Sequence, residues 1–351
     1  MKIIKYIFFL LLLCVIAGSI FIGTQNGSYE ITADKTFDAP HELIYKTISD
    51  YKNLSQWNPY ERDEDAFTYI SEQNEPGSGR WERNDKIYDL ETMQQIPSKK
   101  IKQRLKAPDR DTLNFEQLIW TIEKIQDLET NVTLTVKGEL TFKDKIVQFF
   151  EDKELDERKR SMIQNGFDKL DNHLDALMDV YSIDIKGVTE YGGGFYMYTA
   201  TASSISAMPQ KLSQMLPVVQ AYVTSNNIPQ TGKPFTIYND FNTALGTTIF
   251  SAAIPVRDRV ITPTTSNVLC DFMPRQTVVK AILTGDYKHL AEAWEKIRSY
   301  ISKEGISMNS ELPAFEIYRV DSSAKANPAE WITELYIPVQ PDQPVDDDRN
   351  L

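Results

Sequence analysis

The sequence has few cysteines, the residues that disulfide cross-links require. Its 351 residues include two cysteines, Cys14 and Cys270. Cys14 lies within an apolar N-terminal run, so Cys270 is expected to be an unpaired thiol, and a disulfide framework is excluded. Stability must therefore come from buried apolar surface. A hydrophobic content of 41% is ordinary for a globular protein and is sufficient for real cores.

Histidine and positive charge are also scarce. The three histidines, His41, His173 and His289, are scattered without the spacing of metal ligands, so no metal is expected. Fifty acidic residues against 38 basic ones give a net charge of −12. This balance argues against nucleic acid, whose phosphates need a basic footprint. It is compatible with cationic ligands, although a solvated acidic surface explains it equally well.

Motifs of common enzymes and nucleotide-binding proteins are missing as well. The sequence contains no nucleophile elbow and no phosphate-binding loop, and no cofactor is expected. The glycine run at 192–194 lacks the spacing of a nucleotide motif and predicts a turn. At this length, two domains are the natural expectation.

The first 28 residues predict a membrane-associated segment and a short linker. Lys2 and Lys5 precede an uncharged run rich in Leu, Ile and Phe over 7–23. As a helix this run measures about 25 Å, slightly short of a hydrocarbon core of roughly 30 Å. Small residues at 17–19 could serve a signal peptidase, but apolar residues continue beyond them, so we favour an anchor over a cleaved signal. With either segment the lysines stay in the cytoplasm and the remainder is exported to the periplasmic side, tethered or secreted.

Residues 29–181 are expected to form an α+β domain. A strand over 29–37 leads into a helix that Asp38 and Pro40 open and that ends near Ser49. A densely charged segment over 151–160 and an apolar face repeating every three or four residues predict a long closing helix. Between the helices, runs separated by turn residues predict an antiparallel sheet with strands over 66–73, 79–83, 88–96, 99–105, 114–124 and 131–141.

This is a helix-grip order, and the domain resembles the START-like superfamily (SRPBCC, polyketide-cyclase-like). The stretches that carry the resemblance are FDAPHELIYKTISDYKNLSQWNPY at 37–60 and NVTLTVKGELTF at 131–142. Trp57 and Pro59 match a family feature that closes the mouth of the sheet. The resemblance implies a cavity for an apolar ligand between the sheet and the long helix. Apolar residues that simply fill a core explain the pattern equally well.

Residues 183–340 contain an internal duplication. Phe-x-Ile-Tyr and Ile-Pro-Val occur twice in the same order, and a strand and an apolar helix face precede each copy, so each unit is expected to be β-α-β-β. Two copies predict one continuous sheet with pseudo-twofold symmetry and a groove between them, where ligands commonly bind. The matching segments are the strands at 194–201 and 277–284, Phe-x-Ile-Tyr at 235–238 and 315–318, and Ile-Pro-Val at 254–256 and 337–339.

The duplicated pattern resembles the GyrI-like effector-binding domain, with its GyrI-like or SOUL-type fold. TGDYKHLAEAWEKI at 284–297, PAFEIY at 313–318 and ITELYIPV at 332–339 carry the resemblance. The family implies the drug-sensing half of transcription regulators, in which the glutamate of the last strand, here Glu334, receives cationic aromatic ligands. Some members are instead hydrolases of strained-ring electrophiles that use this glutamate. No helix-turn-helix segment or basic patch is apparent, so transcription control is not carried over.

The residues around Glu334 support a ligand contact independently of the resemblance. Ile332, Glu334 and Tyr336 alternate onto one face of a strand. A carboxylate among apolar groups costs free energy unless something pairs with it, and a ligand cation would do so with help from the ring faces. Burial would raise the pKa of Glu334, which also suits a general acid or base. The alternative is a glutamate that is paired with an internal Lys or Arg, or that faces solvent.

Further aromatic residues complete the expected ligand-binding set. Tyr287 takes the family's Gly-x-Tyr position before the helix and is expected to line the groove. Trp294 lies on the helix face, where core packing competes with ligand contact, and Tyr196 is a candidate aromatic wall. Ser251 and Ala253 replace the glutamate and the tyrosine in the first repeat. Charge is therefore expected to be recognised from one side only.

These features together predict a bacterial, membrane-tethered α+β protein that binds apolar or cationic aromatic ligands without catalysis. One alternative is a detoxifying hydrolase that uses Glu334 with Tyr287 or Tyr336. Another is a structural, partner-binding protein whose cavities are filled by side chains. The expected domains are the anchor and linker at 1–28, the START-like domain at 29–181, the GyrI-like domain at 183–340 and a disordered acidic tail at 341–351.

Overall fold

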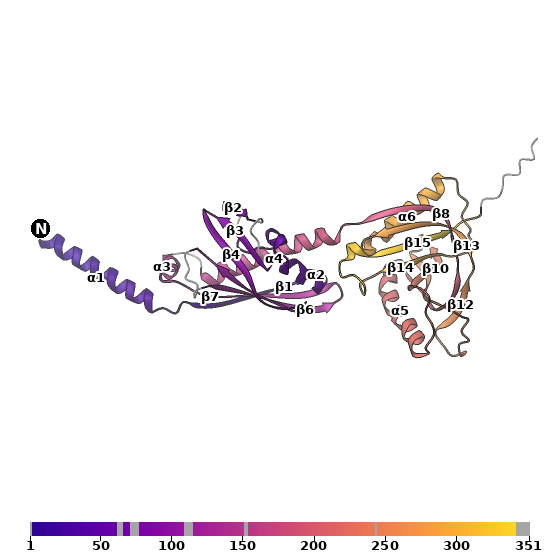
Figure 1. Cartoon of the computed structure of the whole chain (residues 1–351), viewed down its shortest axis with the longest axis horizontal. Coiled ribbons are helices and arrows are strands. Elements are labelled where there is room, and N and C mark those ends of the chain that lie inside the picture. The colour runs from indigo at the N-terminus through magenta and orange to yellow at the C-terminus, as the bar shows by residue number, and fades with distance from the viewer. Residues whose placement is uncertain are drawn as a thin grey trace, which may run out of the picture. The chain divides into compact units, whose positions relative to one another are not determined.

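The chain forms two compact units, Met1–Leu177 and Met178–Leu351 (Figure 1). Each unit has its own antiparallel sheet, which confirms the mixed α+β class. The acidic tail was expected to be disordered over 341–351, and its residues 342–351 lie outside the described residues. The computed structural model describes residues 2–61, 66–70, 77–108, 115–150, 154–242 and 244–341.

Helix α1 is the apolar helix expected at the N-terminus. It spans Lys2–Thr24, and the stretch Ile4–Thr24 has a mean hydropathy of 2.7. None of that apolar stretch is buried against the rest of the chain. By length and composition α1 can therefore act as a membrane anchor or as a signal sequence.

The N-terminal unit is built on a seven-stranded sheet in the order β1-β7-β6-β5-β4-β3-β2. Each sequential pair from β2 to β7 is antiparallel, and β1 closes the sheet against β7. The strands are β1 (Ser28–Phe37), β2 (Phe67–Tyr69), β3 (Ser78–Arg83), β4 (Lys86–Ile96), β5 (Lys100–Lys106), β6 (Glu116–Gln126) and β7 (Glu129–Glu139).

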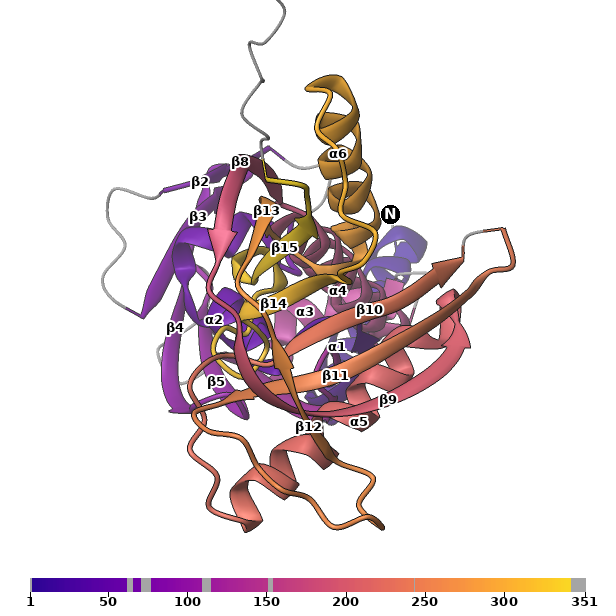
Figure 2. The same ribbon diagram turned by 90° about the vertical axis from the view of Figure 1, so that its right-hand side faces the viewer.

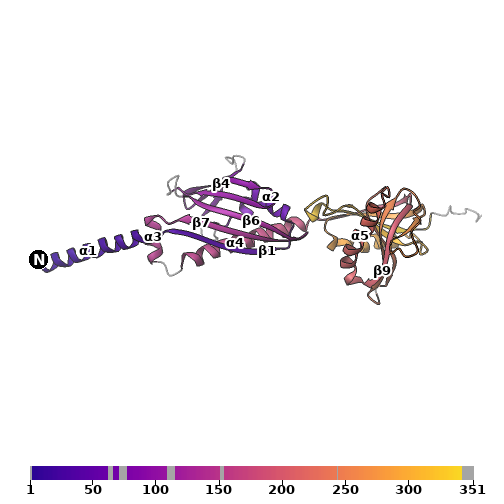
Figure 3. The ribbon, with the colours of Figure 1, turned by 90° about the horizontal axis from the view of Figure 1, so that it is seen from below.

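The helices of this unit are α2 (His41–Ser49), the 3-10 helix η1 (Tyr51–Gln56), α3 (Phe142–Phe150) and α4 (Leu155–Met178). Figure 3 shows α4 running beside the sheet. Its apolar face recurs at three- and four-residue spacing and is buried at Ile163, Phe167, Leu170 and Leu174. Helix α3 was not among the expected elements. The charged segment over 151–160 is helical from Leu155 onward, and its residues 151–153 lie outside the described residues.

Trp57 anchors the segment that was expected to close the mouth of the sheet. Its side chain is fully buried, with its ring 5.8 Å from that of Trp120 on β6. The next residues pass so close to α4 that a Cβ on Gly166 would lie 2.8 Å from the Pro59 Cβ and 3.3 Å from the Trp57 carbonyl oxygen. Gly166 thus permits the close approach of α4 to this segment.

We expect Gly166→Ala to destabilise the N-terminal unit by about 1–3 kcal/mol, the usual cost of forcing extra volume into a packed site. Alanine is otherwise the better helix former by about 1 kcal/mol, so a loss of stability isolates the clash with Pro59. Scanning calorimetry of the full chain in detergent measures the effect. Ser161→Ala, at an exposed position of the same helix, is the matched control. A Gly166→Ala variant as stable as this control would show that α4 and the segment of Trp57 and Pro59 can move apart without loss of free energy of unfolding.

The C-terminal unit is built on an eight-stranded sheet in the order β12-β9-β11-β10-β14-β15-β13-β8. The strands are β8 (Ser182–Tyr191), β9 (Gly194–Ser204), β10 (Phe235–Asn242), β11 (Thr247–Val256), β12 (Leu269–Met273), β13 (Gln276–Thr284), β14 (Ala314–Val320) and β15 (Ile332–Pro338). The helices are α5 (Met208–Ser225) and α6 (Leu290–Lys303), each preceded by a short 3-10 turn, η3 (Ile205–Ala207) or η4 (Tyr287–His289). A further 3-10 turn is η5 (Pro328–Glu330).

The expected duplication is present, and each repeat has one strand more than the expected β-α-β-β. Strand β8 precedes β9, and β12 precedes β13, but neither pairs with the strand that follows it. Instead β8 pairs with β13 and β12 pairs with β9. The first strand of each repeat is therefore an edge strand of the sheet and is hydrogen bonded to the other repeat. The glycine run forms the turn between β8 and β9, where Gly193 has a positive φ and a Cβ would collide with the Met273 carbonyl oxygen.

The two repeats meet where β10 pairs antiparallel with β14, as Figure 2 shows. The registers inside the repeats correspond: Ile237 opposes Ser251, and Ile317 opposes Glu334. Both repeats also have a register shift at the same place, one residue after the tyrosine of Phe-x-Ile-Tyr. The sequence alignment of the repeats is therefore correct residue by residue for β10 with β14 and for β11 with β15. For β9 with β13 it is one residue off, because Met197 opposes Ile254 and Val279 opposes Ile337, so that 194–201 corresponds to 276–283.

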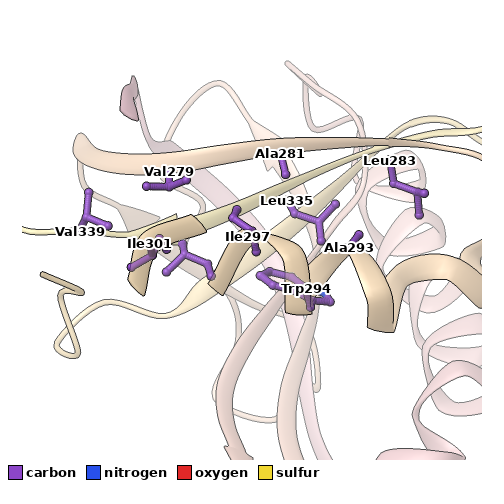
Figure 4. Packing of buried hydrophobic residues seen from close by; sticks show 10 residues of the cluster. Val279, Ala281, Leu283, Ala293, Trp294, Ile297, Ile301, Leu335 and Val339 are labelled. Atoms are coloured by element: carbon purple, nitrogen blue, oxygen red, sulfur yellow. The ribbon is translucent and has the colours of Figure 1, made fainter. Parts of the chain in front are cut away.

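Both helices lie on one face of this sheet, α5 against β9 and β11 and α6 against β13, β15 and β8. Figure 4 shows Trp294, Ile297 and Ile301 of α6 packed against the strands. The alternation expected for the last strand is confirmed. Leu335 and Ile337 pack with α6, whereas Tyr336 belongs to a separate cluster on the other face.

Candidate functional site

Glu334 lies in the middle of β15, on the face away from the helices. Its side chain is 11% exposed. One carboxylate oxygen accepts a hydrogen bond from Lys280 at 2.7 Å, and the other accepts from Arg319 Nε at 2.6 Å and from the Tyr336 hydroxyl at 2.7 Å. The structure thus realises the alternative in which this glutamate is paired with internal basic residues.

This pairing reverses the expected electrostatics of Glu334. Burial alone raises the pKa of the carboxyl group, as anticipated, but the hydrogen bonds from Lys280, Tyr336 and Arg319 and the charge of Arg319 lower the pKa below its usual value. The expectation of a raised pKa is therefore wrong, because two cations on neighbouring strands outweigh desolvation. An ionised, ion-paired carboxylate is a poor general base or acid near neutral pH.

An aromatic cluster surrounds Glu334 on this face. The rings of Phe315 and Tyr336 are stacked at 4.7 Å, and Tyr191 lies 4.7 Å from Phe315. Tyr196 belongs to the same cluster through Phe235, at 5.4 Å, and its hydroxyl approaches Asp271 at 3.4 Å. Two of the sequence-predicted residues, Tyr196 and Tyr336, thus share the face of Glu334.

Tyr287 and Trp294 lie on the opposite face of the sheet. Tyr287 is in the turn before α6, with its ring 5.6 Å from Tyr318 and 4.8 Å from Trp331. Trp294 packs in the core between α6 and the sheet. The expectation that Tyr287 joins Glu334 in one site is therefore wrong. The turn that carries Tyr287 leads directly into α6 and so lies on the helix-covered face of the sheet, whereas Glu334 lies on the other face. A hydrolase built on Glu334 and Tyr287 lacks the required proximity.

The residue that Tyr287 and Trp294 surround is Glu316, which was not among the predicted site residues. Glu316 is the second residue of Phe-Glu-Ile-Tyr on β14 and is 1% exposed. Its carboxylate accepts hydrogen bonds from the Tyr318 hydroxyl at 2.5 Å and from the Trp294 indole nitrogen at 3.2 Å. Tyr238 of the first repeat also hydrogen bonds to it. We call Glu316, Trp294, Tyr238 and Tyr318 the Glu316 cage.

Within the described residues, no Lys or Arg forms an ion pair with Glu316. Burial raises the pKa of its carboxyl group more than the hydrogen bonds from Tyr318, Tyr238 and Trp294 lower it. The guanidinium of Arg298 lies over the Trp294 ring, 5.7 Å from its centroid, and forms no ion pair with the carboxylate of Glu316 in the described part of the chain. Glu316 and Glu334 therefore have pKa values shifted in opposite directions.

The Glu316 cage lies where the two repeats meet. Glu316 is directly opposite Thr236 in the β10–β14 pair, and these two residues occupy the same position of the repeated motif. Tyr238 and Tyr318 are likewise equivalent, and the Tyr318 hydroxyl lies 2.7 Å from the Thr236 hydroxyl. A sequence signal existed: the variable position of Phe-x-Ile-Tyr holds Thr in one copy and Glu in the other.

The first repeat supplies no equivalent of Glu334, as expected. Ser251 is buried and donates a hydrogen bond to the side chain of Asn239 at 2.9 Å, and Ala253 packs within the aromatic cluster. Cys14 and Cys270 are both free thiols. Among the described residues, no group of three or more His, Cys, Asp or Glu is arranged to hold a metal ion.

Residues 199–340 match the family described as a GyrI-like small molecule binding domain. No curated protein matches the chain. Among solved structures, the chain is similar to the EcmrR C-terminal domain, with 20% identity over 46% of this chain and 98% of that one and a TM-score of 0.39. It is also similar to EcmrR in a complex with DNA (16% identity, 57% and 78% covered, TM-score 0.40) and to SAV2435 bound to tetraphenylphosphonium (12%, 45% and 94%, 0.33).

We expect Glu316→Gln to gain stability relative to the parent as the pH rises. Because the pKa of Glu316 is raised in the folded state, the parent loses stability as pH climbs above the ordinary carboxyl value of 4.5, whereas glutamine cannot ionise. Calorimetry of the C-terminal transition between pH 5 and pH 9 gives this difference.

Glu334→Gln should behave in the opposite way. The pKa of Glu334 is lowered in the folded parent, so the ionised carboxylate stabilises the fold at pH values above the unfolded pKa. At neutral pH the variant should therefore be less stable than the parent by about 1–3 kcal/mol, the range for charged hydrogen bonds. This difference in stability should shrink as the solution is acidified. Parallel pH dependence of the two variants would contradict the assignment of opposite pKa shifts.

Proposed function

The C-terminal unit contains a GyrI-like small-molecule-binding domain over residues 199–340, and we propose that its ligands are cationic aromatic or apolar molecules. The observation that carries this proposal is the burial of Glu316 among uncharged donors and aromatic rings. An ionised carboxylate without a counter-cation is costly in an apolar interior. A ligand cation would offset that cost, and the ring faces of the cage and of Tyr287 would add cation–π attraction.

Tyr287 is the side chain by which a ligand would enter the cage. It is half-buried in the turn before α6, and its ring lies 5.6 Å from that of Tyr318 in the cage. Trp294 and Tyr238 are 5.4 Å apart and belong to different repeats, so movement of α6 against β10 would separate them. We propose that the ligand displaces Tyr287 and Trp294 and places its positive charge against Glu316.

Glu334, Tyr336 and Tyr196 are proposed as ligand contacts on the other face of the sheet. With Lys280 and Arg319, Glu334 forms a cluster of one net positive charge, so a cation there would have to displace one of the two basic groups. We therefore assign recognition of the cation to Glu316 and contacts with polar or apolar parts of a ligand to the Glu334 face. The expectation that the chain does not bind nucleic acid stays a prediction.

Binding of tetraphenylphosphonium tests the cation assignment, because this aromatic cation has a fixed charge at every pH. We expect Glu316→Gln to weaken binding by roughly tenfold or more, about 1.4 kcal/mol for each factor of ten. Affinity of the parent should rise with pH as Glu316 ionises, and affinity of Glu316→Gln should not. Isothermal titration calorimetry measures the affinities. All variants are titrated in the same detergent, so that partition of the cation into micelles is the same for each.

Glu334→Gln is the matched control for this titration. If it abolishes binding while Glu316→Gln leaves binding intact, Glu334 is the carboxylate that receives the cation and the Glu316 assignment is wrong. If binding is equal in all three proteins and independent of pH, the site does not recognise charge.

For the N-terminal unit we propose a START-like domain that binds an apolar ligand, tethered to the membrane by α1 with both units on the periplasmic side. The element order of strand, helix, antiparallel sheet and long helix supports a helix-grip arrangement. The unburied apolar surface of α1 and the lysine at its beginning support the anchor and its orientation.

An uncleaved anchor predicts that the purified protein keeps residues 1–28 and floats with lipid vesicles after an alkaline carbonate wash. A chain that begins at Gln25 should stay in the soluble fraction under the same wash, since an apolar helix across the bilayer is not released by alkali. Intact mass and flotation are measured together. A mature protein that lacks the first residues and does not float would identify α1 as a cleaved signal.

A further inference from the structure

We propose that α3 is a second membrane contact, which lies in the surface of the bilayer that α1 enters. This inference rests on the proposed anchoring by α1. It concerns an interaction surface of the N-terminal unit and commits to one partner, a phospholipid bilayer.

The first observation is the exposure of the apolar side chains of α3. None of its nine residues is buried. Phe149 is 60% exposed and Phe150 is 76% exposed, and their rings contact each other at 5.3 Å without being covered. Phe142 and Val147 are about half exposed as well. Four large apolar side chains on one short helix make a patch of the kind that marks an interaction site.

The second observation is that α3 is attached to the protein by its polar residues. Asp144 accepts hydrogen bonds from the Thr141 amide and hydroxyl, at 3.0 and 2.8 Å. Gln148 accepts one from Arg158 of α4, and Lys145 donates one to a backbone carbonyl. A surface helix of a globular protein normally faces the core with its apolar side. Here the orientation is inverted, so the apolar side faces outward.

The third observation is the place of α3 beside the end of α1. Lys145 Nζ donates a hydrogen bond of 2.6 Å to the carbonyl oxygen of Gln25, the residue that follows α1. The Phe142 ring is 3.7 Å from where a Cβ of Gly23 would be. Figures 1 and 3 both show α3 next to the last turn of α1. The end of a spanning helix lies at the lipid–water boundary, so α3 is at that boundary too.

A bilayer is the partner that these observations fit best. Phenylalanine side chains on one face and polar groups on the other are typical of helices that lie in the plane of a membrane interface. Lys143 is exposed on the same helix, and its flexible side chain can reach lipid phosphates. The contact is continuous with α1 and needs no second protein. A second attachment point would restrict tilting of the N-terminal unit on the membrane.

Fluorescence quenching of the full chain in vesicles of phosphatidylcholine and phosphatidylglycerol tests this contact. Phe149→Cys, in a background with Cys14→Ser and Cys270→Ser, carries an environment-sensitive label. We expect its emission to shift to the blue, to be quenched by brominated lipid about as strongly as a label at Phe21→Cys in α1, and to be protected from aqueous iodide. Phe150→Cys is a second labelling site should the first impair folding.

Ile125→Cys is the matched control. Ile125 is 52% exposed at the end of β6, and the register of β1 with β7 places it at the end of the sheet opposite to α1. Its label should be open to iodide and unaffected by brominated lipid. A Phe149 label that behaves like the Ile125 label, in a protein that still floats with vesicles, would overturn the proposal and leave the anchor intact. Protection from iodide without lipid quenching would mean that a second protein chain covers α3, which also overturns it. A protein that does not float would remove the anchor and this inference together.

Discussion

The antiparallel pairing of β10 with β14 is the constraint on which the C-terminal unit depends. It joins the two repeats into one sheet and places equivalent motif positions, Thr236 and Glu316, opposite each other. Because both helices lie on the same face, the side chains that converge beside this pair come from both repeats. The carboxylate at this position lies on an interior strand of the sheet, and Glu316 is 1% exposed. The exchange of β8 and β12 between the repeats reinforces the same junction, since neither half can be removed without losing an edge strand of the other.

The two glutamates of the second repeat show how local partners decide the state of a buried carboxylate. Glu316 and Glu334 lie on neighbouring strands and are similarly buried by area. Glu334 has Lys280 and Arg319 within hydrogen-bonding distance, and their attraction exceeds the penalty of desolvation. Glu316 has two tyrosine hydroxyls and an indole as hydrogen-bond donors, and these neutral donors do not compensate for burial. The same residue type thus provides a structural ion pair on one face and an unneutralised acid on the other.

The N-terminal unit has a different asymmetry. Its core follows the usual rule, with α4 placing a regular apolar face against the sheet and Gly166 permitting close contact with the Trp57 segment. Helix α3 breaks the rule, because its polar side chains bond to the protein and its phenylalanines do not. An arrangement of this kind is stable only beside a second apolar phase or where exposure is tolerated. Its position next to α1 places it beside the bilayer if α1 is the membrane anchor that we propose.

Much of this architecture follows from the sequence alone. Hydrophobic periodicity and the repeated motifs predicted the α+β class, the N-terminal apolar helix, most strands and the match of β10 and β11 with β14 and β15, because these depend on spacing within short segments. Alternation along β15 correctly separated Tyr336 from Leu335. What only the tertiary structure decided were contacts between segments distant in the chain. The exchange of β8 and β12, the pairing of Glu334 with Lys280 and Arg319, and the separation of Tyr287 from Glu334 all depend on strand order. Strand order is set by packing and closure of the whole sheet, which leave no local signal in the sequence. For the same reason, the sequence shows a glutamate at the variable position of Phe-x-Ile-Tyr but does not show that Glu316 is the buried acid at the junction of the repeats.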